Sequence, residues 1–111
     1  MNIEERREGA VTVVRPQGPL VLGDAEQFKA AVDDVMTRSL GRFVIDASAV
    51  PYLDSRGLET LAEISETLSQ RGGVLRLCGA NDTLREVFDL TDTSPLFEHF
   101  ADVNAGVRSF L

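Results

Sequence analysis

Residues 42–58, RFVIDASAVPYLDSRGL, decide the fold. The run Arg42–Asp46 is short, apolar and β-branched, which is typical of a strand that is covered on both faces. Ala47–Leu53 is expected to form a loop, and a helix is predicted to begin at Asp54 or Ser55. A buried strand followed by a helix is the unit from which parallel sheets are built.

Upstream, Val11–Val14 is predicted to be a strand, and a shorter strand around Ile3 would pair with it as a hairpin. A helix should follow, with Asp24 as its N-cap, Gln27 closing a capping box and Gly41 ending it. Its apolar residues share one helical face. They are Ala25, Phe28, Val32, Val35 and Met36.

Downstream, strand and helix periodicity keep alternating. The expected elements are a helix that stops at Arg71–Gly73, a strand Val74–Cys78, a helix from Asn81 or Asp82, an edge strand Leu96–Phe100 and a helix within Val103–Phe110. The order β-β-α-β-α-β-α-β-α predicts an α/β fold. We expect one domain over residues 1–111, with a mixed, mostly parallel sheet of four to five strands and about four helices.

The charge of the chain argues against several partners. The net charge is −7 and the eleven basic residues form no run, so we expect no nucleic-acid partner and no attraction to anionic membranes. No stretch of about 18 apolar residues is present, and the charged start MNIEERREG does not resemble a signal peptide. These features predict a cytoplasmic protein that does not insert into a membrane.

The sequence holds no recognisable metal or cofactor motif. One histidine, His99, and one cysteine, Cys78, cannot form a structural zinc site, and no acidic segment resembles a calcium loop. Neither a P-loop nor a Gly-x-Gly-x-x-Gly turn occurs, so we expect no cofactor. Cys78 lies in an apolar run and is expected to be a small buried hydrophobe.

Asp54 and Ser55 lie where a loop meets a helix, and their residue types suit three roles. The first is capping, in which a side chain accepts hydrogen bonds from free N–H groups and contributes about 1 kcal/mol. In the second role, the same N–H groups would favour a phosphate carried by Ser55. The third is a nucleophilic serine, but Leu53 stands where a nucleophile elbow has its first glycine, and His99 is the only candidate base. We therefore do not expect an enzyme.

Gly57 falls in the first turn of this helix, where glycine weakens the helix by up to about 1 kcal/mol. Its missing side chain would leave room for another backbone segment or for a partner protein. Close packing of the helix on the sheet is the simpler explanation.

Four segments resemble the STAS domain in order and spacing: Phe43–Asp46, Asp54-Ser55-x-Gly57-Leu58, Gly72–Val74 and Leu84–Leu90. The chain looks most like the stand-alone bacterial anti-sigma factor antagonists. The resemblance implies the STAS fold and phosphorylation of Ser55 by the anti-sigma factor, which is itself a serine kinase. The unmodified protein would bind the anti-sigma factor, the phosphorylated protein would release it, and a phosphatase would reset the system.

By this resemblance the partner-binding residues are Asp54, Ser55, Arg56, Gly57 and Leu58. Val21 stands where many members of the family carry an aspartate, and Arg56 replaces a small residue. These two positions favour an alternative, a phosphorylation-independent adaptor in a stress-signalling assembly or a lipid-transport ABC complex. The edge strand near Ile3 also leaves weak homodimerisation open.

Overall fold

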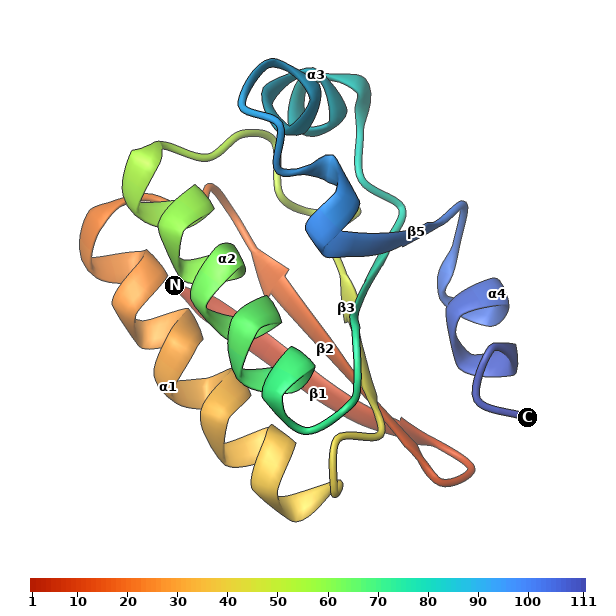
Figure 1. Cartoon of the computed structure of the whole chain (residues 1–111). Helices are drawn as coiled ribbons and strands as arrows, with labels where there is room; N and C mark the ends of the chain where they lie inside the picture. Colours follow the sequence, from red (N-terminus) through yellow and green to blue (C-terminus); the bar gives the residue numbers. More distant parts are fainter.

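The computed structural model describes residues 1–111, which form a five-stranded sheet in the order β1-β2-β3-β4-β5 (Figure 1). The first two strands are antiparallel and the remaining neighbours are parallel. The strands are β1 (Asn2–Glu8), β2 (Val11–Gln17), β3 (Phe43–Asp46), β4 (Leu75–Cys78) and β5 (Phe97–Phe100). The helices are α1 (Leu22–Arg38), α2 (Ser55–Gln70), α3 (Asp82–Leu90) and α4 (Val103–Arg108), with a 3-10 turn over Ser94–Leu96. The predicted mixed α/β fold is confirmed.

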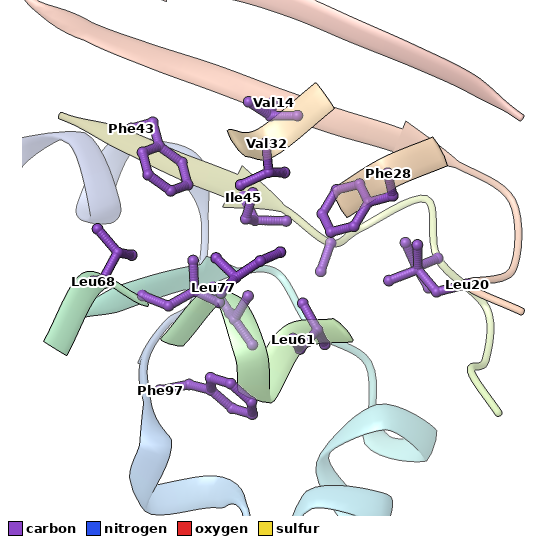
Figure 2. Close-up of a cluster of buried hydrophobic side chains, with 14 of the residues drawn as sticks. Val14, Leu20, Phe28, Val32, Phe43, Ile45, Leu61, Leu68, Leu77 and Phe97 are labelled. Atoms are coloured by element: carbon purple, nitrogen blue, oxygen red, sulfur yellow. The ribbon is translucent and has the colours of Figure 1, made fainter. Parts of the chain in front are cut away.

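The helices cover the two faces of the sheet unequally. Helices α1 and α2 lie side by side on one face, whereas the short α4 lies on the other (Figure 1). The first face holds a cluster of 18 buried hydrophobic residues, ten of which are labelled in Figure 2. The second holds only Val11, Val13, Val44 and Cys78, packed against α4 and its neighbours. Each large apolar side chain buried here contributes about 1.5–3 kcal/mol, so the α1–α2 face supplies most of the stability.

The start of α1 differs from the prediction. The helix begins at Leu22, and the N-cap residue Val21 makes no side-chain capping bond. Asp24 is therefore not the N-cap, and its Oδ1 atom lies 3.3 Å from the N-terminal ammonium of Met1. Gln27 does not close a capping box either, because its side chain hydrogen-bonds the backbone of Met1. Both side chains hold the chain terminus, which strand β1 brings beside α1.

Three helices end in the same left-handed turn, a Schellman motif in which a glycine is usual at the left-handed position. In α1 the N–H of Gly41 donates to the carbonyl of Met36, and the left-handed residue is Leu40 with φ +55°. Gly72 occupies the matching position in α2 and Asp92 in α3. The prediction that Gly41 ends α1 is thus only partly right, because the helix stops at Arg38 and a leucine makes the turn.

None of the helices is both long enough and apolar enough to cross a lipid bilayer.

Candidate functional site

The loop before α2 crosses the edge of the sheet where the parallel strands end. Leu20, just past β2, and Leu53 form an isolated parallel bridge, and the N–H of Asp54 donates to the carbonyl of Leu20 at 3.2 Å. The loop is also fastened to the start of α3, because the Asn81 side chain donates to the carbonyl of Pro51 at 3.2 Å. These bonds fix the position from which α2 begins.

Asp54 caps α2 and also contacts the start of α1. Its Oδ1 atom accepts a hydrogen bond from the N–H of Gly57 at 2.9 Å, which confirms the capping role. Its Oδ2 atom accepts from the N–H of Leu22 at 3.2 Å. One carboxylate therefore satisfies a free donor in the first turn of each of two helices and ties them together.

Gly57 is buried against the backbone of the strand-to-helix connection. A Cβ atom at this position would overlap the carbonyl oxygen of Leu20 and would come within 3.0 Å of the Cβ of Leu53. The absent side chain therefore makes room for another backbone segment of this chain. Of the explanations open at the sequence level, the structure supports close packing of the helix on another backbone segment, the connection around Leu20 at the edge of the sheet, and not the need for a partner protein.

Ser55 is the first residue of α2, and it is exposed. Its hydroxyl has no hydrogen-bond partner within the chain. The N–H groups of Ser55 and Arg56 belong to the first turn, so neither has an acceptor inside the helix. A phosphate on the Ser55 hydroxyl would meet these donors and the positive end of the helix dipole.

Arg56 is held by ion pairs with its neighbours. Its guanidinium bonds the carboxylate of Glu26 on α1 and lies 4.0 Å from Glu59 one turn further along α2. All three side chains are between 45% and 67% exposed, so these pairs stabilise the fold little. They do balance the charge of Arg56, so this residue does not make the surroundings of Ser55 basic.

Two apolar side chains near Ser55 were not predicted as site residues. Leu22 is 68% exposed and Tyr52 is 52% exposed. Tyr52 belongs to the loop that contains Asp54, and Leu22 donates its N–H to the Asp54 carboxylate. Leu58, which was predicted, is half buried against the core. The apolar pair Val21-Leu22 ahead of a helix is the available signal for Leu22, but the usual capping rule points to Asp24 as the start of that helix.

His99 makes its hydrogen bonds away from Ser55. Its Nε2 atom lies 3.2 Å from the hydroxyl of Ser94 and 3.1 Å from the Ser94 carbonyl. The ring also packs beside Phe88 and Phe97. The structure therefore joins His99 to the 3-10 turn before β5, and it forms no nucleophile–base pair with Ser55.

Cys78 is fully buried, as predicted. Burial raises the pKa of its thiol to about 12, and the carboxylates of Asp46 and Asp102 add to the shift. The thiol is therefore protonated at neutral pH and is a poor nucleophile. No three histidine, cysteine, aspartate or glutamate side chains come together as a metal site would require.

Comparisons with known proteins agree with this architecture. Residues 2–106 match a protein-family profile described as the STAS domain. A Bordetella bronchiseptica protein named as an anti-sigma factor antagonist, BtrV, is 30% identical over 81 residues, which cover 73% of this chain and 70% of that one.

Two solved structures share the fold at lower identity. A Thermotoga maritima protein described as an anti-sigma factor antagonist, TM1081, superposes with a TM-score of 0.87 at 20% identity, covering 96% of this chain and 92% of that one. The phosphorylated form of the Bacillus cell fate determinant SpoIIAA superposes with a TM-score of 0.73 at 18% identity, covering 99% of this chain and 100% of that one.

Proposed function

Because the chain belongs to the STAS domain family, we propose that it is an anti-sigma factor antagonist that is switched by phosphorylation of Ser55. The unmodified chain binds an anti-sigma factor with serine kinase activity. Transfer of the γ-phosphate of ATP to the Ser55 hydroxyl ends this complex, and a phosphatase restores it. The observation that carries the proposal is the exposed, unpartnered hydroxyl of Ser55 at the first position of α2.

The docking surface in this proposal surrounds the start of α2. Asp54 fixes the position of this turn, Gly57 lets it lie close to the sheet, and Leu58 joins it to the core. The exposed side chains of Leu22 and Tyr52 add apolar area beside Ser55. An apolar centre with polar groups at its rim is the usual composition of a protein–protein interface.

Phosphate would disrupt such an interface by charge. It adds a charge of about −1.5 to −2. The surrounding surface already carries the carboxylates of Asp54, Glu26 and Glu59. At ~5 Å and an effective dielectric constant of ~20, one like-charge pair with an acidic group of the partner costs about 3 kcal/mol. That cost lowers affinity on the order of a hundredfold, which is enough to dissociate a moderate complex.

Two properties of the Bordetella and Bacillus relatives support the proposal. BtrV is named as an anti-sigma factor antagonist, and SpoIIAA, which shares this fold, has been solved in a phosphorylated form. Val21 and Arg56 still favour the alternative of a constitutive adaptor. Val21 stands where many members of the family carry an aspartate, and Arg56 replaces a small residue. The experiment must therefore separate a switch from permanent binding.

The test uses three forms of the purified chain as baits in extracts of the source cells: wild type, Ser55→Ala and Ser55→Asp. We expect a serine kinase with an ATP site to be retained by the wild type and by Ser55→Ala, and to be lost from Ser55→Asp. Ser69→Asp is the matched control, because it makes the same change at an exposed position near the end of the same helix. Equal capture of one partner by all baits would contradict the switch and support the constitutive adaptor.

A further inference from the structure

The β1–β2 turn and the end of α1 lie at the opposite end of the sheet from the start of α2 (Figure 1). Residues of both segments line a basic groove there. It consists of two hollows of about 620 and 280 Å³ that share Leu40 and Arg42. Six of the ten arginines line it: Arg6, Arg7, Arg38, Arg42, Arg71 and Arg76. We call this surface the arginine groove.

The arginine groove has little internal compensation for its charge. Glu5 is the only acidic residue in its lining, in a chain whose net charge is −7. Arg38 pairs with Glu5 and Asp34, and Arg6 pairs with Glu8 on the same strand, whereas Arg7 and Arg42 form no ion pair. Basic residues near the ends of helices complement the helix dipole, and this explains Arg38 and Arg71. It does not explain the arginines that the β1–β2 hairpin and the start of β3 bring to the same surface.

Leu40 lies between the two hollows and is 88% exposed. It adopts φ +55°, a conformation that costs a residue with a side chain about 1–2 kcal/mol. The neighbouring helix α2 makes the same turn with Gly72, which avoids this cost. The Leu40 side chain belongs to neither hydrophobic cluster, so packing within this chain does not offset the cost of its conformation. Strained residues often occur at ligand-binding sites, so an exposed leucine with this conformation raises the question of what binds there.

The hydroxyl of Ser39 gives the groove an unused polar group. Ser39 lines the larger hollow, and its Oγ atom is buried without any hydrogen-bond partner. A carboxylate bound in this hollow would supply an acceptor if the Ser39 side chain turned toward it. Arginine binds carboxylates through two parallel hydrogen bonds, which are about twice as strong as bonds between neutral groups.

From these observations we propose that the arginine groove is a second docking surface, which binds an acidic segment of a partner protein. The carboxylates of that segment pair with Arg7, Arg42 and Arg71, and one apolar side chain packs on Leu40. A protein segment fits better than a small phosphate compound, because the surface combines separated guanidinium groups with an exposed leucine. Since Ser55 lies at the other end of the sheet, both surfaces can be occupied at once.

The test measures binding of the purified full chain to a fluorescein-labelled peptide of aspartates and glutamates around one central phenylalanine. We expect saturable binding that weakens as salt is added. Arg42→Glu should lower affinity about tenfold or more, and Arg7→Glu should act in the same direction. Arg85→Glu is the matched control, because Arg85 is also exposed and free of ion pairs but lies on α3, outside the groove.

Two further comparisons identify the ligand. Leu40→Ser should weaken the peptide severalfold but should not change binding of an otherwise identical peptide without phenylalanine. Inorganic tripolyphosphate, or a short RNA, that binds more tightly than the peptide and ignores Leu40→Ser would overturn the proposal in favour of a phosphate site. Absence of peptide binding, or equal losses in Arg42→Glu and Arg85→Glu, would also overturn it.

Binding at the arginine groove can be tested independently of the switch at Ser55. The variant Ser55→Asp should bind the acidic peptide as the wild type does, because the two surfaces lie at opposite ends of the sheet. Thermal unfolding of each variant checks that the fold is intact. Arg42 suits this design, because its side chain is exposed and makes no hydrogen bond that the substitution would remove.

Discussion

Helix α1 carries an exposed leucine in a left-handed conformation at each end. Leu22, at its start, has φ +45° and is 68% exposed, and Leu40, just past its end, has φ +55° and is 88% exposed. Their surroundings differ. Leu22 donates its N–H to Asp54 beside the exposed Ser55, whereas Leu40 lies among arginines. The two proposed docking surfaces therefore share one local feature and differ in charge.

The two ends of the molecule also differ in how rigidly their side chains are held. At the Ser55 end, the carboxylate of Asp54 and the close approach of Gly57 to Leu20 fix the first turns of two helices. At the arginine groove, side chains are exposed and several guanidinium groups are unpaired. Substitutions at the Ser55 end should thus affect stability most, and those in the groove should affect binding more than stability.

The largest effect is expected for Gly57→Ala. The new Cβ would overlap the Leu20 carbonyl, so the helix must move, at a cost of about 3 kcal/mol in the free energy of unfolding. Gly23→Ala makes the same change in the first turn of α1, where no atom lies within 4 Å of the added carbon. That control should be neutral or stabilising by up to about 1 kcal/mol. Urea unfolding of both variants measures the difference, and equal losses would refute the packing explanation.

Asp54→Ala should have the next largest effect, about 2 kcal/mol, because it removes two capping bonds from two helices. Asp102→Ala is the comparison, since Asp102 caps only α4 through one bond to the N–H of Ala105. It should cost about 1 kcal/mol. Urea unfolding tests this order. If Asp54→Ala cost no more than Asp102→Ala, the bond to Leu22 would contribute nothing.

The smallest effect on stability is expected for Leu22→Gly and Leu40→Gly. Glycine removes the strain of the left-handed backbone and little packing is lost, but it adds freedom to the unfolded chain, so each variant should be stabilised by at most about 1 kcal/mol. The two variants should separate in binding. Leu40→Gly should weaken the acidic peptide alone, and Leu22→Gly should reduce capture of the kinase partner alone. Loss of both activities in either variant would contradict two separate surfaces.

Much of the architecture was predictable from the sequence, because strands such as Phe43–Asp46 and the amphipathic helices have clear periodicity. Asp54 was recognisable as a cap, because the donor that it serves in α2 is three residues away in sequence. Its second bond was not predictable, because Leu22 is 32 residues away and becomes a neighbour only when the sheet forms. Because that bond is hidden from the sequence, the capping rule selects Asp24 for α1, and this selection is wrong.

Other features of the two surfaces depend on tertiary structure as well. A glycine in the first turn of a helix is unusual enough to single out Gly57 from the sequence, but only the fold shows that the Leu20 carbonyl fills its space. The arginines of the groove come from four separate segments of sequence and form no run, so charge patterning along the chain could not reveal them. The sequence does not point to Leu40, because the glycine beside it satisfies the usual rule for the end of a helix.

The most direct test of the central claim is mass spectrometry of the protein recovered from its source cells, with its bound partners, before and after the signalling conditions change. We expect phosphate on Ser55 in part of the pool, and a serine kinase of the anti-sigma type bound to the unmodified part. Partners that stay bound while Ser55 is never modified would contradict the switch. The chain would then be a constitutive adaptor.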